Sequence, residues 1–327
     1  MSPGTVVVAI GLSALGIAIL LWANLVSPER LATRTAKRVG LRLPDAPVRE
    51  QLMRRVRHTR RWISNCAALG LLLTLGGTLL AAAAGDFPDP LSSTTWLSIA
   101  GLVLGGAIGA LLGVLTAQPQ LDPTQPRVAH AQHTALRDYL DPIELVGARV
   151  VTALAIVTGI ATAVVLAQTH ETRTAVAESS LTPAALALPV VAVLSLLVLE
   201  LGGRRVILTR PRLAASPEAL VWDDALRADD LRILVSAPLM TGLYGFILGL
   251  PSLYRLVPQQ DLGGEIVLLT LANVGFFVLM IALLVVVAFA IVRKPEQFYL
   301  RRLWPDLAAA TVAPPTSADP SREQDQP

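Results

Sequence analysis

The sequence predicts an all-α integral membrane protein with seven transmembrane helices. Of its 327 residues, 53% are hydrophobic and only 16% are charged, whereas soluble domains carry about 25% charged residues. The apolar residues are gathered into blocks of about 20 with almost no charge, which is the length that a helix needs to cross the hydrocarbon core of a bilayer. These observations exclude a soluble globular enzyme, a fibrous protein and a disordered chain.

Seven segments qualify as spanning helices by length and apolar composition. The expected spans are residues 5–26, 62–84, 95–116, 145–168, 181–201, 231–250 and 266–292. The last is longer than a bilayer requires, so we expect it to tilt or to extend past the membrane. The first has no basic residues before it and many after it, which is the reverse of a cleavable signal peptide. Residues 1–26 are therefore expected to be a retained anchor helix.

Basic residues are concentrated in alternate connections between the expected spans. Residues 29–61 hold eleven Lys or Arg, and further basic residues follow the third, fifth and seventh spans. The loops on the opposite side hold only Arg173 and Arg255. By the positive-inside rule the amino terminus is outside and the carboxyl terminus is cytoplasmic, in a multi-pass protein of the inner (plasma) membrane. The tail 313–327 is rich in Pro, Ser, Asp and Gln and is expected to be disordered.

The expected spans repeat with a period of about 85 residues. A shift of 85 lays the second span on the fourth, the third on the fifth, the fourth on the sixth and the fifth on the seventh. Five residues match at this shift: Thr124, Pro126, Arg127, Ala129 and Asp138 fall on Thr209, Pro211, Arg212, Ala214 and Asp223. We expect residues 62–312 to be a six-helix bundle of three parallel two-helix repeats, each followed by a cytoplasmic segment. Unrelated hairpins with similar loops are the alternative.

The third expected span carries a glycine at every fourth position. These glycines are Gly101, Gly105, Gly109 and Gly113. This spacing places them on one helix face, where the backbone of another helix can approach closely. We expect this face to pack against a helix of the same chain, and contact between two copies is the alternative. Gly106 lies on a different part of the helix surface.

Residues 27–61 are expected to be a basic amphipathic segment on the cytoplasmic side. Within residues 47–62, Val48, Leu52 and Val56 recur every four positions, as in a helix with one apolar face. Five arginines supply its positive charge: Arg54, Arg55, Arg57, Arg60 and Arg61. We expect this helix to lie on the anionic lipids of the inner leaflet, with a cytoplasmic protein partner as the alternative. Nucleic acid is not expected, because aromatic residues are not interleaved with the arginines.

Acidic residues gather in two of the cytoplasmic segments. The first holds Asp138, Asp141 and Glu144, and the second holds Asp223, Asp224, Asp229 and Asp230. Such carboxylates could bind Mg²⁺ together with a diphosphate substrate, but the repeated Asp-x-x-x-Asp spacing of intramembrane prenyltransferases is missing. Asp223 stands four residues before Arg227, which suits a helical ion pair. We therefore expect charged surface helices, and metal binding by Asp138 and Asp223 stays open.

Motifs that would indicate catalysis are missing. The sequence has no Gly-x-x-x-x-Gly-Lys phosphate loop and no Gly-x-Ser-x-Gly nucleophile motif. His130 and His133, with Asp138 nearby, are an alternative metal site, although no His-Glu-x-x-His pattern occurs. Asn273 is the one strongly polar residue near the centre of an expected span, and no charged residue marks an ion pathway there. We assign no catalytic residue, cofactor or metal.

One stretch resembles a known group of proteins. Residues 204–214, RRVILTRPRLA, and residues 223–230, DDALRADD, lie just before an expected span. They resemble cytoplasmic loops in uncharacterised multi-spanning integral membrane proteins of GC-rich actinobacteria. The resemblance covers about 30 residues closely and implies a plasma-membrane protein. It carries no activity and no catalytic residue.

The sequence therefore favours a non-enzymatic scaffold or a component of a membrane complex. The expected partners are anionic inner-leaflet lipids and either another membrane protein or a second copy of the chain. A permease for a small or lipophilic substrate is the first alternative, which a polar cavity at Asn273 would favour. A Mg²⁺-dependent lipid-modifying enzyme is the second, which convergence of Asp138 and Asp223 on a pocket would favour.

Overall fold

The computed structural model describes residues 27–41, 44, 46–84, 90–117, 135–167, 182–208, 217–255 and 297–312, and five single positions before residue 27. All regular structure in these residues is helical. Five helices are long and apolar enough to cross a membrane: Leu52–Leu80, Thr94–Thr116, Pro142–Ala167, Thr182–Arg205 and Glu218–Leu250. They correspond to the second to sixth expected spans. The first and seventh expected spans, 5–26 and 266–292, lie almost wholly outside the described residues.

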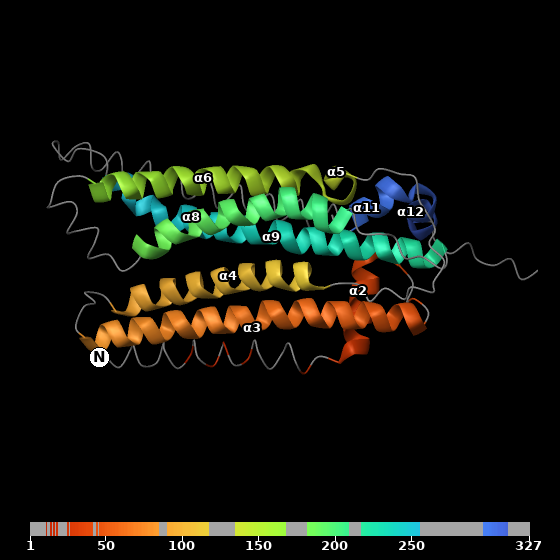
Figure 1. Cartoon of the computed structure of the whole chain (residues 1–327), viewed down its shortest axis with the longest axis horizontal. Helices are drawn as coiled ribbons and strands as arrows, with labels where there is room; N and C mark the ends of the chain where they lie inside the picture. The colour runs from red at the N-terminus through yellow and green to blue at the C-terminus, as the bar shows by residue number, and fades with distance from the viewer. Residues whose placement is uncertain are drawn as a thin grey trace, which may run out of the picture.

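The long helices form two groups that lie side by side (Figure 1). One group is a hairpin of α3 (Ala46–Ala84) and α4 (Pro90–Thr116), which pack along each other. The other contains α6 (Pro142–Ala167), α8 (Thr182–Leu197) and α9 (Pro217–Arg255). Helix α9 packs against α6 and α8 and also against α4 of the first group, so it makes most of the contact between the two groups, and a smaller contact joins α4 to α8.

Helix α3 is longer than the sequence predicts. It runs without interruption over 39 residues, so the expected surface helix 47–62 and the span 62–84 are one helix. No Pro or Gly interrupts the chain between Pro47 and Gly70, and Pro47 lies in the first turn, where a missing N–H is tolerated. The arginine-rich residues therefore stand in line with the span rather than flat on the membrane. Helix α9 also has 39 residues and also begins with a polar segment.

A break separates the short helix α5 (Leu136–Tyr139) from α6. Leu140 adopts an extended conformation, with φ −110° and ψ 137°, and ends α5. Pro142 disfavours helical geometry in the residue before it, Asp141, so a separate helix begins at Pro142. Asp141 then caps α6, since its Oδ1 accepts the N–H of Ile143 at 3.0 Å. Glu144 Oε2 in turn accepts the N–H of Asp141 at 3.3 Å. These two bonds satisfy backbone N–H groups at the start of α6 in the manner of a capping box and stabilise it.

Shorter helices gather at one end of the bundle, here called the basic end (Figure 1). They are α2 (Pro28–Val39), α5, α11 (Phe298–Leu303) and α12 (Pro305–Val312), and the π-helix η1 (Val198–Leu208) continues α8. Helix α2 ends at Gly40, whose φ of 80° is a left-handed conformation that favours glycine. The N–H of Gly40 bonds the carbonyl of Ala36 at 2.9 Å and closes the helix.

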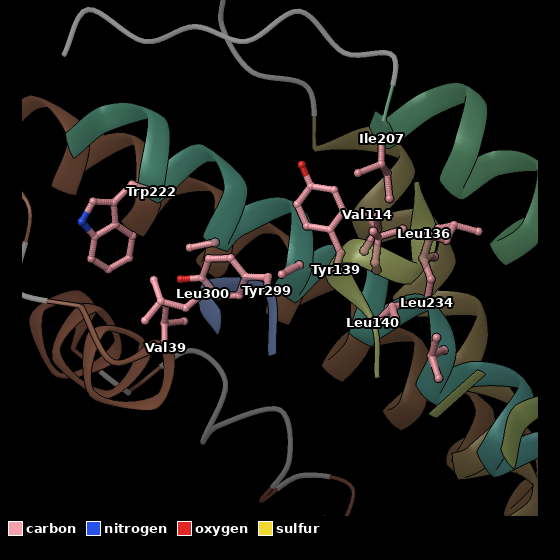
Figure 2. Close-up of a cluster of buried hydrophobic side chains, with 14 of the residues drawn as sticks. Val39, Val114, Leu136, Tyr139, Leu140, Ile207, Trp222, Leu234, Tyr299 and Leu300 are labelled. Carbon is pink, nitrogen blue, oxygen red and sulfur yellow. The ribbon is translucent and has the colours of Figure 1, made fainter. Parts of the chain in front are cut away.

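The largest cluster of buried apolar side chains also lies at the basic end. Figure 2 shows the rings of Trp222, Tyr139 and Tyr299 together with Leu300 and Val39, which come from α9, α5, α11 and α2. Each of these side chains is almost fully buried. The long helices instead expose large apolar residues along their outer faces, as expected for helices in contact with lipid. The largest apolar core of the described chain therefore lies where the short helices meet α9.

Candidate functional site: a polar network at the basic end

The carboxylates of α9 form the centre of a polar network at the basic end. Asp223 Oδ2 accepts a hydrogen bond of 2.9 Å from Arg227 Nε one helical turn later, so the predicted ion pair is confirmed. The two aspartates further along α9 reach other helices. Asp229 pairs with Arg38 of α2, and Asp230 pairs with Arg55 of α3. These pairs tie the amino-terminal helices to the basic end of α9.

Asp224 is the most enclosed part of this network. Its side chain accepts a hydrogen bond of 2.8 Å from the hydroxyl of Tyr139 in α5 and one of 3.2 Å from the indole N–H of Trp304. Asp224 is only 2% exposed and Tyr139 is fully buried. A buried carboxylate is costly unless donors replace the lost water, and hydrogen bonds to a charged acceptor are the stronger kind. The two aromatic donors thus hold α5 and the link between α11 and α12 against α9.

The acidic residues outside α9 are also engaged within the chain. Asp138 accepts the backbone N–H of Ala135 at 2.8 Å and lies 3.7 Å from Arg302 Nε. Glu144, besides its part in the capping box of α6, lies 3.4 Å from Arg232 Nε of α9. Each of the seven carboxylates singled out in the sequence therefore contacts a cation or a hydrogen-bond donor of this chain.

The structure does not bring the candidate metal ligands together. Asp138 and Asp223 are held by different partners, Arg302 and Arg227 respectively. Within the part of the chain that the structure describes, no group of three or more His, Cys, Asp or Glu residues is arranged to hold a metal ion. His130, His133 and Asn273 lie outside the described residues.

Sequence reasoning did not find the aromatic members of this network. Tyr139 and Trp304 both lie next to charged residues in the sequence, and such a placement is a signal for a ring with a polar partner. Tyr299 differs from them, because its buried hydroxyl has no hydrogen-bond partner among the described residues. Burial and the negative charge of Asp224 raise the pKa of Tyr299, so this hydroxyl stays protonated.

The five arginines expected at the membrane surface point in different directions. Arg54 and Arg61 are exposed, and Arg54 pairs with Glu50 one turn earlier at 2.9 Å. Arg57 and Arg60 are partly buried. The side chain of Arg55 is only 13% exposed and pairs with Asp230. Arg55 therefore departs from the expected surface role, because the straight continuation of α3 turns this position towards α9.

The four glycines at spacing four lie against α3. A Cβ added at Gly105 would stand 2.0 Å from the carbonyl oxygen of Cys66, and one at Gly109 would stand 2.5 Å from that of Trp62. A Cβ at Gly101 would stand 2.3 Å from Thr74 Oγ1 and 2.5 Å from the carbonyl oxygen of Gly70, and Gly113 lies against Thr59. A Cβ at Gly106 would meet nothing nearer than 3.9 Å. The glycines thus set the close approach of two backbones within the α3–α4 hairpin.

Glu200 pairs with arginines of two helices at the basic end. Arg204 Nη2 lies 3.5 Å from Glu200 Oε2, and Arg149 Nε of α6 donates to Glu200 Oε1 at 3.0 Å.

No protein-family model, curated protein or solved structure matches the chain. Inferences about function therefore rest on the geometry of the described residues.

Proposed function

We propose that the protein is a non-enzymatic component of a membrane complex, and that its basic end is a platform for a protein partner. The observation that carries this proposal is the engagement of its cytoplasmic carboxylates in contacts between helices. A carboxylate held by a buried arginine or by two aromatic donors can bind Mg²⁺ only if those contacts break. The same contacts fix α2, α5 and the α11–α12 link to α9, which favours a rigid platform over a mobile catalytic loop.

The chemistry of the platform also indicates the kind of partner. Exposed residues on its short helices include Lys37 of α2, Arg137 of α5 and Arg301 of α11. Exposed basic side chains attract an acidic surface and steer its association. We therefore infer a partner with an acidic face on the same side of the membrane.

Affinity purification from native membranes tests the scaffold proposal. The wild-type chain should carry a partner at a constant ratio, and the Lys37→Glu/Arg301→Glu variant should lose it. Arg54→Glu/Arg61→Glu changes the charge equally on the outer face of α3 and should keep the partner. Recovery of no protein at a constant ratio, or equal loss in both variants, would contradict the proposal.

We further propose the finer topology that the charge pattern predicts: seven spans, the basic end in the cytoplasm and the amino terminus outside, in the plasma membrane. Support comes from the five helices that are long and apolar enough to span. The basic end also holds α2 and the start of α3, the most arginine-rich part of the chain. A cytoplasmic location of this end obeys the positive-inside rule.

We also infer that the hairpins arose by duplication with a period of 85. Helices α3 and α9 begin 171 positions apart and end 171 positions apart, one more than twice this period. Helices α5 and α6 correspond to α3 and α9 in the middle unit. A break before Pro142 divides this unit's helix in two, whereas α3 and α9 are each continuous. The matching lengths support three related units. Transport through a cavity at Asn273 remains the alternative function, and it depends on a residue outside the described part of the chain.

A further inference from the structure

A cavity of about 410 Å³ lies at the basic end between α2, α3 and α9. Its charged lining residues are Arg34, Arg38, Arg55, Arg60, Asp229 and Asp230. Asp229 pairs with Arg38 and Asp230 pairs with Arg55. The four arginines exceed the two aspartates, so the charged lining has a formal charge of +2.

The arrangement of the arginines favours a bound anion. Arg34 of α2 and Arg60 of α3 face the same cavity and lie close enough for their positive charges to repel each other. Arg55 adds a buried Nε that has no hydrogen-bond acceptor among the described residues. An anion between these groups would remove the repulsion and accept several charge-assisted hydrogen bonds. Guanidinium groups match the geometry of phosphate oxygens especially well.

The cavity also changes character along its depth. Arg34 and Arg38 stand at an exposed mouth, where the side chain of Arg38 is 49% exposed. The apolar lining consists of Val56 and Ile63 of α3 and Leu226 and Ile233 of α9, and the two isoleucines lie further along these helices than the arginines and aspartates. Both isoleucines belong to helices that are long and apolar enough to cross a membrane. A charged mouth that leads to an apolar wall suits a molecule with an anionic head and a hydrocarbon tail.

We propose that this cavity binds the phosphate group of an anionic phospholipid. Arg34 and Arg60 contact the phosphate oxygens, and the hydrocarbon of the lipid begins along Ile63 and Ile233. This site is distinct from general attraction of exposed arginines to a leaflet, because residues of three helices line it and two of its arginines pair with aspartates of α9. It does not depend on the scaffold proposal, so either proposal can fail without the other.

The test uses the purified full-length protein in detergent, with native mass spectrometry and thermal unfolding as readouts. The probes are phosphatidylglycerol, phosphatidylcholine and inorganic phosphate. The wild type should retain phosphatidylglycerol in preference to phosphatidylcholine. Loss of the two arginine contacts in Arg34→Gln/Arg60→Gln should weaken phosphatidylglycerol binding by about tenfold or more. Arg54→Gln/Arg61→Gln removes the same charge from exposed positions of α3 and should weaken binding by less than about twofold.

Arg34→Gln alone keeps the test decisive if the double variant does not fold, because Arg34 is exposed. Its melting temperature without lipid should equal or exceed that of the wild type, because the change removes the repulsion between positions 34 and 60. Its lipid-induced stabilisation should be smaller. Equal weakening in the cavity and control variants would overturn the site in favour of general surface charge. If inorganic phosphate raises the melting temperature of the wild type as much as phosphatidylglycerol does, the site binds a soluble phosphate. That result would overturn the proposal of a lipid site.

Discussion

Tyr139 donates a hydrogen bond to Asp224, a residue that lies 85 positions later in the chain. This separation equals the period of the proposed duplication, so the two residues hold equivalent places in neighbouring units. When a rotation axis relates two units, equivalent residues can touch only if they lie close to that axis. Equivalent residues far from the axis are separated by the rotation. Under the proposed duplication, the axis between α5–α6 and α9 therefore passes through the basic end, where the polar network is most deeply buried.

The two buried tyrosines of the basic end should respond differently to loss of the hydroxyl. Tyr139→Phe should lower the free energy of unfolding by about 2 kcal/mol, because the buried carboxylate of Asp224 loses a donor. Tyr299→Phe should change it by less than about 0.5 kcal/mol, since its hydroxyl bonds no described residue and stays protonated. Thermal unfolding of both variants in the same detergent measures the difference. Equal destabilisation would show that ring packing, rather than the hydrogen bond, holds α5 to α9.

The ion pair between α3 and α9 should matter more than the neighbouring surface pair. Arg55→Gln removes the arginine that pairs with Asp230, whose side chain is 5% exposed, and should cost about 3 kcal/mol of stability. Arg54→Gln breaks a pair with Glu50 in which both side chains are more than half exposed. Its cost should be below about 1 kcal/mol. Chemical unfolding of the two variants compares adjacent arginines of one helix, and a similar cost for both would refute the buried role of Arg55.

Single methyl groups should distinguish the glycines of α4. Gly105→Ala and Gly109→Ala place a Cβ within 2.5 Å of a carbonyl oxygen of α3, and the forced shift of the backbone should cost about 1–3 kcal/mol each. Gly106→Ala meets only ordinary contact distances and should be neutral or slightly stabilising, because alanine favours the helix. Melting temperatures in detergent measure all three. Identical values would show that the close approach of α3 and α4 is unimportant.

The proposed topology predicts which residues a membrane-impermeant thiol reagent can reach. On a Cys66→Ala background, cysteines introduced at Ser92, Ser179 and Gln260 should be labelled from outside intact cells. A cysteine at Ser216, between the fifth and sixth spans, should be labelled only after the cells are permeabilised. Labelling of position 216 in intact cells would reverse the assignment of the basic end to the cytoplasm.

The sequence predicts the long helices well and their polar contacts poorly. Apolar composition locates the spans of α3, α4, α6, α8 and α9 because burial in lipid imposes length and hydrophobicity directly on the chain. The pair of Asp223 and Arg227 is also predictable, since four residues separate them on one helix.

Contacts between distant helices carry no such local pattern. Arg55 and Asp230 are separated by 175 positions, so nothing in the sequence near Arg55 indicates that it turns inward. The sequence also does not indicate the full length of α3, for a related reason. A change from polar to apolar composition near Trp62 resembles a boundary, but no Pro or Gly there ends the helix.

Because α9 is made long after α2 and α3, its ion pairs with these helices can form only late in synthesis. Arg38 is made 191 positions before Asp229, and at about 5 to 20 residues per second that delay is roughly 10 to 40 s. During this time the arginines of α2 and α3 have no aspartates of α9 to pair with, and their charge can hold the nascent chain on one side of the membrane. Arrival of α9 then pairs Arg38 with Asp229 and Arg55 with Asp230, so the joining of α2 and α3 to α9 follows the synthesis of α9.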